Sequence, residues 1–124
     1  MQEPTARRIL IADDQEVIRT LVARVLRRAG FQPFEATDGE DAITQLEAER
    51  FDAVVLDLMM PRVDGFGVIE HLIRSQPQMV EKTIVMTAFP QTAAKGRLNH
   101  VCAVLAKPFE VTELIRHVQE CASR

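Results

Sequence analysis

Short apolar runs alternate with longer segments in which apolar residues recur at helical spacing. The central runs are brief, rich in β-branched residues and apolar at successive positions, which is typical of strands buried on both faces of a parallel sheet. The runs lie at 9–12, 31–36, 51–58, 83–86 and 103–106. Alternation of this kind with short connections predicts an α/β domain, doubly wound, with helices on both faces of a five-stranded sheet.

Two topologies fit this alternation, a mononucleotide-type order and the flavodoxin-like order 2-1-3-4-5. The second run is weak and contains Pro33, which favours a place at a sheet edge because proline cannot donate to a neighbouring strand. We therefore predict the (βα)5 flavodoxin-like order, which puts strands one and three side by side at the centre.

The first and last helices show the clearest apolar stripes. The first stripe consists of Val17, Ile18, Leu21, Val22, Val25, Leu26 and Ala29, and the last of Val111, Leu114, Ile115, Val118 and Ala122. The first-helix arginines fall off the stripe and are interpreted as a solvated face, and Gly30 is placed to end that helix.

The middle helices carry start signals. Thr37 and Glu40 have the spacing of a capping box, and Asp64–Gly65 can start a third helix. The stripes that follow are Ala42, Ile43 and Leu46, and then Phe66, Ile69, Leu72 and Ile73, with Pro77 beyond the end. Residues 88–100 are ambiguous because Pro90 and Gly96 both weaken a helix there.

The composition fits one globular domain of 124 residues, 47% hydrophobic and 27% charged, with residues 1–8 expected to form a loose leader. A net charge of −3 argues against a surface that coats nucleic acid. No apolar run is long enough to span a membrane and no signal-peptide pattern is present, so we expect a cytoplasmic protein. In that compartment Cys102 and Cys121 are expected to be buried free thiols rather than a disulfide.

Polar residues follow four of the runs. Asp13 and Asp14 follow the first, Asp57 ends the third, and Thr87 and Lys107 follow the fourth and fifth. In the predicted order these side chains meet at one rim of the sheet. Three carboxylates there repel one another, so a cation must neutralise them; oxygen ligands without His or Cys favour Mg²⁺.

Such a pocket suits phosphoryl transfer. A carboxylate can act as the nucleophile and form an aspartyl-phosphate, while positioning and charge neutralisation do most of the remaining work. No histidine or cysteine is placed to serve as a base, and none is needed.

Four motifs resemble the receiver domain of two-component response regulators. They are Ile9-Leu-Ile-Ala-Asp13-Asp14, Leu56-Asp57-Leu-Met-Met-Pro61-Arg-Val-Asp-Gly65, Met86-Thr87-Ala88 and Ala106-Lys107-Pro108-Phe109. The resemblance covers residues 1–124 as a single receiver domain, with no output domain expected in this chain.

The resemblance implies a role for each motif. Asp57 is the phosphoacceptor, and its donor is a histidine kinase or a histidine phosphotransfer protein. Asp14, Asp57 and the backbone carbonyl of Met59 are implied to bind Mg²⁺ directly, with Asp13 acting largely through water. Thr87, Ala88 and Lys107 are implied to hold the phosphoryl group.

Three features depart from the family pattern. Val104 stands where the family usually has the Tyr or Phe that moves with the threonine, so we expect the switch to rely on the loop after Thr87. Phe89, Val104 and Pro108 are the predicted switch and output residues. The segment from Thr87 to Lys107 is shorter than the corresponding segment usual in the family, which predicts a short, irregular or mobile fourth helix. Met59 and Phe89 flank the phosphoryl site with apolar groups, which should hinder water and lengthen the life of the phosphoryl group.

The sequence is compatible with one leading function and one alternative, and it disfavours two others. The leading one is a phosphorylation-controlled signalling domain that catalyses its own phosphorylation and dephosphorylation and is not otherwise an enzyme. A pseudo-receiver that binds proteins constitutively is the alternative. A phosphatase of the Asp-x-Asp type is disfavoured because position 59 is methionine, and the absence of a Gly-rich loop disfavours dinucleotide or flavin binding.

Overall fold

The computed structural model describes residues 6–90, 96 and 98–124. Its elements follow the predicted order. They are β1 (Arg8–Ala12), α1 (Glu16–Arg28), β2 (Gln32–Ala36), α2 (Gly39–Ala48), β3 (Ala53–Asp57), α3 (Gly65–Ser75), the 3-10 helix η1 (Pro77–Lys82), β4 (Thr83–Thr87), β5 (Ala103–Ala106) and α5 (Val111–Ala122). The strands form one parallel sheet of order β2-β1-β3-β4-β5, which confirms the flavodoxin-like prediction and the edge position of Pro33.

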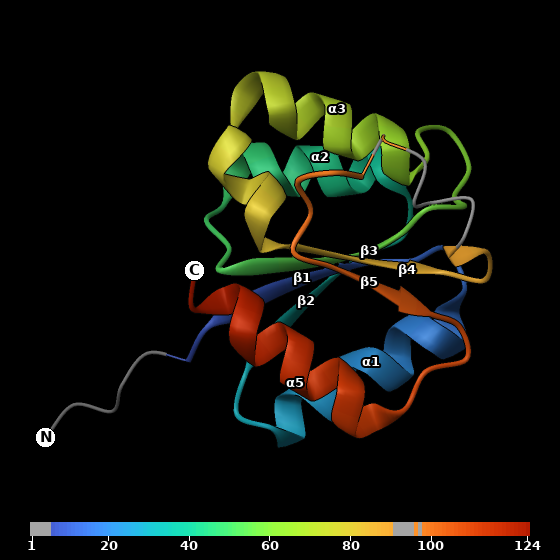
Figure 1. Ribbon diagram of the computed structural model, residues 1–124, viewed down its shortest axis with the longest axis vertical. Helices are drawn as coiled ribbons and strands as arrows, with labels where there is room; N and C mark the ends of the chain where they lie inside the picture. Colours follow the sequence, from blue (N-terminus) through green and yellow to red (C-terminus); the bar gives the residue numbers. More distant parts are fainter. Residues whose placement is uncertain (1–5, 91–95, 97) are drawn as a thin grey trace, which may run out of the picture.

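Helices cover both faces of the sheet (Figure 1). One layer contains α2, α3 and η1, and the other contains α1 and α5. Successive strand residues pack on opposite sides: Leu10 and Val54 belong to the core under α2 and α3, while Ile11 and Val55 belong to the core against α1 and α5. The strands are apolar throughout because each side of the sheet has its own core.

The predicted stripe of α1 was too wide. Val22 and Leu26 are buried, but Val17 is 79% exposed and Leu21 is 45% exposed. The helix packs on the sheet along one face only, and Ala23 occupies part of that face. Val17 and Leu21 are therefore surface residues.

Two details of the middle helices were also wrong. Asp38, not Thr37, caps α2: its carboxylate accepts from the backbone N–H of Asp41 at 2.7 Å. In α3 Val68 is buried and Ile73 is exposed, because the helix turns Ile73 away from α2 and the sheet. Asp64 caps α3 as predicted, and η1, which begins at Pro77, was not predicted.

The prediction of free thiols is contradicted by a disulfide between Cys102 and Cys121. Cys102 immediately precedes β5 and Cys121 lies in the last turn of α5, and their Cα atoms are 5.9 Å apart, within the range that a disulfide spans. The prediction relied on the expected cellular compartment, and the spacing in sequence did not reveal the tertiary contact between α5 and β5.

The loose leader predicted through residue 8 is wrong for its last two residues. Arg8 belongs to β1, and its backbone N–H donates to the carboxylate of Asp52 at 2.7 Å. Arg7 donates to the Ser123 hydroxyl. Residues 1–5 lie outside the described part of the chain, as does most of the segment assigned to a fourth helix, so amide exchange over residues 91–99 still has to test that prediction. Across the described ranges, no helix combines the length and the apolar character needed to cross a bilayer.

Candidate functional site

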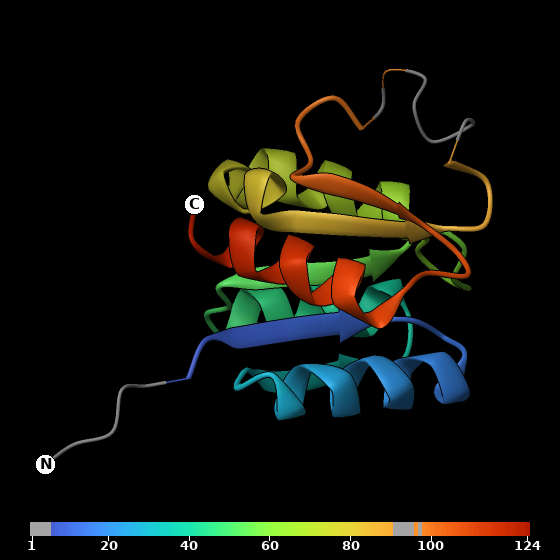
Figure 2. The ribbon, with the colours of Figure 1, turned by 60° about the horizontal axis from the view of Figure 1, so that its bottom comes forward.

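Three carboxylates meet where β1 and β3 end. The two strands pair directly, with Ala12 opposite Leu56, so Asp13 and Asp14 after β1 lie beside Asp57 at the end of β3. One carboxylate oxygen from each aspartate lies within 4.8 Å of the others. All five strands point toward this edge (Figure 2), as the parallel topology requires. The rim predicted from sequence therefore exists at the carboxyl ends of the central strands.

Lys107 joins the acidic cluster from the end of β5. Its Nζ lies 3.1 Å from Oδ2 of Asp13 and 3.4 Å from Oδ2 of Asp57. The Lys107 backbone N–H donates to the Thr87 carbonyl at 2.8 Å, which fixes the start of the loop, and the Lys107–Pro108 peptide is cis. One ammonium group thus contacts two of the three carboxylates.

The surroundings of Asp57 disfavour its ionised form. The residue is only 4% exposed. Burial, and secondly the charge of Asp13, raise the pKa of Asp57 to about 6, although Lys107 opposes the shift. One ammonium does not balance three carboxylates. An all-oxygen cluster with surplus negative charge fits a hard divalent cation such as Mg²⁺.

A pocket of about 270 Å³ opens over these carboxylates. Its lining consists of Asp14, Gln15, Asp57, Met59, Ala88 and Lys107. Thr87 is buried and does not line the pocket, and its hydroxyl accepts a hydrogen bond from the Phe89 N–H at 3.0 Å. The pocket therefore brings together the predicted site residues Asp14, Asp57, Met59, Ala88 and Lys107, but not Thr87.

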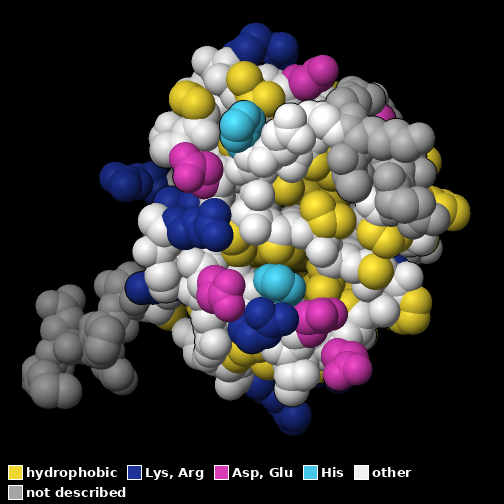
Figure 3. Space-filling view, viewed as in Figure 1, with side chains coloured by type: hydrophobic (Ala, Val, Ile, Leu, Met, Phe, Trp, Pro, Cys, Tyr) yellow, Lys and Arg dark blue, Asp and Glu magenta, His cyan; other side chains and the backbone are white. Residues whose placement is uncertain are grey.

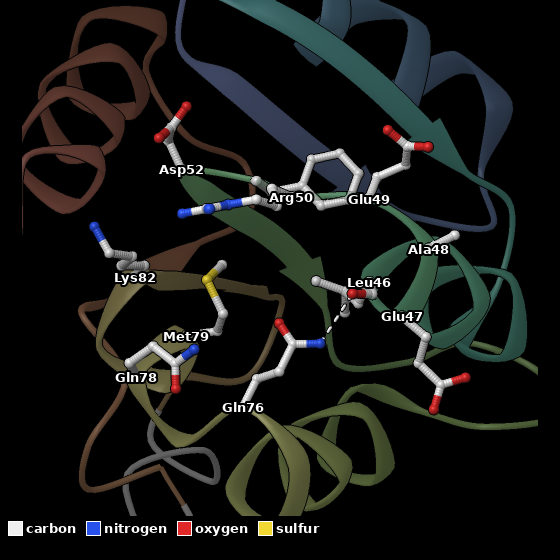
Figure 4. A pocket seen from close by; sticks show the side chains of 11 residues that line it. Leu46, Glu47, Ala48, Glu49, Arg50, Asp52, Gln76, Gln78, Met79 and Lys82 are labelled. Carbon is white, nitrogen blue, oxygen red and sulfur yellow. Dashed lines mark hydrogen bonds between the residues drawn. The ribbon is translucent and has the colours of Figure 1, made fainter.

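A second pocket of about 610 Å³ lies at the other end of the strands, near the amino ends of β3 and β4 (Figure 4). It is formed by the end of α2, the start of β3 and η1, and Gln76 bridges it by donating to the Leu46 carbonyl at 2.9 Å. Arg50, Asp52 and Lys82 bring charges of both signs to its rim. In open parallel sheets ligands bind at the carboxyl ends of the strands, so we assign the candidate site to the smaller pocket.

Comparison with known proteins identifies the family to which the chain belongs. The family model of the response regulator receiver domain matches residues 9–119. The chain belongs to this family. Among curated relatives, the transcriptional regulatory protein PdtaR of Mycobacterium tuberculosis is 34% identical over 95% of this chain and 58% of its own length. Sporulation initiation phosphotransferase F of Bacillus subtilis is 33% identical over 86% of both chains.

Solved structures of receiver proteins share the fold. The response regulator TrrA of Thermotoga maritima, solved in complex with Mg²⁺-BeF, superposes with a TM-score of 0.86 at 27% identity, covering 93% of this chain and 98% of that one. This chain spans just over half the length of PdtaR.

The residues predicted to tune the site or the switch lie in three places. Met59 and Phe89 are exposed beside the carboxylate pocket. Val104 belongs to the edge strand β5 and is 37% exposed. Hydrophobic side chains gather on the face of the molecule that Figure 3 shows, over and beside that strand. Pro108 is exposed and lines a small apolar groove with Phe109. Val104 is thus a partly exposed surface residue of β5.

Sequence reasoning missed Arg19. The side chain is only 12% exposed, and it donates to the Asp13 carbonyl at 2.8 Å and to the Glu35 carboxylate at 3.0 Å. It had been grouped with the solvated arginines of α1. Its spacing of three and seven residues from the buried Val22 and Leu26 was the available signal that it lies on the inner face.

Proposed function

We propose that this receiver accepts a phosphoryl group on Asp57 from the phosphohistidine of a sensor kinase or of a phosphotransfer protein, and that the modification changes its contacts with other proteins. The supporting observation is the placement of Asp57: a buried carboxylate at the end of a central strand, beside two further aspartates and one lysine. The reaction is placed in the cytoplasm, and residues 1–124 are taken as one receiver domain.

Transfer consists of attack by an Asp57 carboxylate oxygen on phosphorus. The P–O bond forms while the P–N bond to the imidazole breaks, and the bonding electron pair leaves with the imidazole nitrogen. With a pKa of about 6, Asp57 is mostly ionised at neutral pH and needs no separate base.

Asp14, Asp57 and the Met59 carbonyl are the proposed ligands of Mg²⁺, with Asp13 acting through water. When bound, the ion neutralises charge on the carboxylates and on the phosphoryl oxygens. The Lys107 ammonium, now 3.4 Å from Asp57, is placed to follow the negative charge onto the phosphoryl group. The Thr87 hydroxyl and the Ala88 N–H are proposed to donate to the same oxygens.

The partner is proposed to dock beside the pocket through helix packing. Val17, Leu21 and Val111 are exposed apolar residues on α1 and α5. A groove of about 300 Å³ lies next to them. Its lining consists of Ile18, Leu21, Lys107, Pro108, Phe109 and Val111. An apolar groove that includes Lys107 suits the helix of a kinase or phosphotransfer protein, since a docked helix would bring its histidine near Asp57.

The second candidate function is a pseudo-receiver that binds its partner without phosphorylation. Val104 favours it, because the aromatic that usually accompanies the threonine in switching is missing.

Intact-mass measurement after incubation with a small acyl-phosphate donor tests the proposal. We expect one phosphoryl adduct that requires Mg²⁺, is lost at alkaline pH and is absent in Asp57→Asn. Asp64→Asn is the matched control: Asp64 is an exposed helix cap in the same loop, asparagine caps equally well, and the adduct should persist. Absence of an adduct with folded wild-type protein would favour the pseudo-receiver.

A further inference from the structure

We propose that Arg62 is a positioning residue for the cation site: its ion pair with Asp38 holds the loop between β3 and α3, in which the Met59 N–H lies 3.4 Å from Oδ1 of Asp57 and the Met59 carbonyl is a proposed Mg²⁺ ligand. The inference rests on the proposed function, because it concerns the Mg²⁺ that phosphoryl transfer is proposed to need. Neither side chain lines the carboxylate pocket, so neither is a direct contact of an ion bound there.

The two ends of this loop are tied together. The Gly65 N–H donates to the Leu58 carbonyl at 2.9 Å, which closes residues 58–65 into a ring. A Cβ at position 65 would lie 2.6 Å from the Asp57 carbonyl oxygen, so only glycine permits this approach. The ring begins just after the phosphoacceptor strand and contains Met59. This hydrogen bond joins the two ends of the loop but does not hold the residues midway between them, including Arg62.

Arg62 ties down the outer part. Its φ is 68°, in the left-handed region that non-glycine residues seldom adopt. From that conformation its Nε donates to Oδ2 of Asp38 at 2.8 Å. The Asp38 side chain is only 8% exposed, and its other oxygen already caps α2. A rare backbone conformation directed at a buried carboxylate indicates that the surrounding contacts hold it in place.

The loop also lies directly on the first turn of α2. Gly39 has no space for a Cβ, because that atom would fall inside the carbonyl oxygen of Val63. The Val63–Gly39 contact lies directly beside the Arg62–Asp38 pair, because the two loop residues are consecutive and the two α2 residues are also consecutive. Together they attach the loop to a helix that the core holds rigidly, and Met59 lies three residues before Arg62.

Two other roles for the Arg62–Asp38 pair predict a different effect on Mg²⁺ affinity. If Arg62 only stabilised α2, its removal would leave Mg²⁺ affinity unchanged. If it acted only through its charge, removing a cation would strengthen Mg²⁺ binding, since fewer positive charges would oppose the ion. Positioning alone predicts weaker binding.

The test is a Mg²⁺ titration followed by the amide chemical shifts of residues 12–15 and 57–60. We expect Arg62→Ala to raise the Mg²⁺ Kd by about 5- to 10-fold, toward the lower end of what loss of an outer partner costs a metal site. Arg62→Lys should recover part of the loss by keeping the charge near Asp38. Arg116→Ala is the control, because Arg116 forms an exposed pair with Glu120 on α5, and its Kd should equal that of the wild type.

Asp38→Asn provides an independent variant that keeps the cap of α2 but loses the ion pair. It should raise the Kd similarly, and the double variant should show no further loss, because both changes remove one interaction. An unchanged or lower Kd in folded Arg62→Ala or Asp38→Asn would overturn the inference while leaving the proposed function intact. Wild-type protein without Mg²⁺ binding that depends on Asp57 would overturn both.

Discussion

Asp57 carries an energetic cost in the free protein. It is buried next to Asp13, and its pKa of about 6 lies above the ordinary value of 3.8 for an aspartate. The folded protein therefore binds a proton more tightly than the unfolded chain, and stability falls as pH rises from about 4 to about 6. Above that window the full cost of the charge is present.

We predict that Asp57→Asn stabilises the metal-free protein at pH 7.5 by about 1–2 kcal/mol, because the amide removes the buried charge and its repulsion with Asp13. The gain should fade as pH falls from about 6 to about 4, and below about 4 Asp57 is protonated in both states. Urea unfolding at several pH values in the presence of a chelator measures it. A gain of the same size at every pH would contradict the electrostatic explanation.

Met59 is 67% exposed at the rim of the carboxylate pocket. We predict that Met59→Asn shortens the lifetime of the phosphoryl group by several-fold, because an amide can orient the attacking water that a thioether hinders. The decay of the phosphorylated mass peak measures it. Met60→Leu is a matched control, since Met60 is buried and outside the pocket lining; equal decay in Met59→Asn and wild type would contradict the prediction.

At the scale of elements, the disulfide joins the start of β5 to the end of α5. Cys102 and Cys121 are 19 residues apart, and the segment between them contains Lys107, Pro108, Phe109 and Val111 of the groove lining. The bond therefore closes β5 and α5 into one unit, which adds to the packing of Leu114 and Val118 on the sheet.

We predict that reduction of this disulfide destabilises the protein by about 3 kcal/mol, the loop-closure entropy expected for a ring of this length. Urea unfolding with and without a dithiol reductant measures the change. The double variant Cys102→Ser, Cys121→Ser should be destabilised to a similar extent and should not respond to the reductant. Identical midpoints for oxidised and reduced wild type would contradict the prediction.

At the scale of the molecule, cation binding should couple to folding, because the three aspartates come together only in the native state. We predict that Mg²⁺ at ten times its Kd stabilises the wild type by about 1.4 kcal/mol, and that Asp57→Asn gains much less. Thermal unfolding with and without Mg²⁺ measures it. Equal stabilisation of both proteins would place the ion elsewhere.

Transmission of the signal should also differ from that of relatives with an aromatic at position 104. Val104 is β-branched and partly exposed, with few rotamers to exchange. We predict that phosphorylation shifts the amide resonances of the loop after Thr87 more than those around Val104. Heteronuclear spectra before and after phosphorylation measure this, and comparable changes in both regions would contradict it.

Much of the candidate site could be predicted from the sequence because its residues lie at the carboxyl ends of strands. Asp13, Asp14, Asp57 and Lys107 each follow or end an apolar run, and the carboxyl ends of parallel strands meet at one edge. That inference needs only the order of elements. The burial of Arg19 and Asp38 could not be read in this way, because it depends on which side of a helix faces the sheet and on how a loop crosses its neighbour.

The sequence by itself determined the class of fold, the sheet order and the acidic rim, because alternating periodicity and residue type are local properties of the chain. Only the tertiary structure decided that Cys102 meets Cys121, that Lys107 contacts Asp13 as well as Asp57, and that Arg62 reaches Asp38. Each of these pairs joins residues 19 or more positions apart. Such contacts are set by how packed elements approach one another in space, which no short-range pattern records.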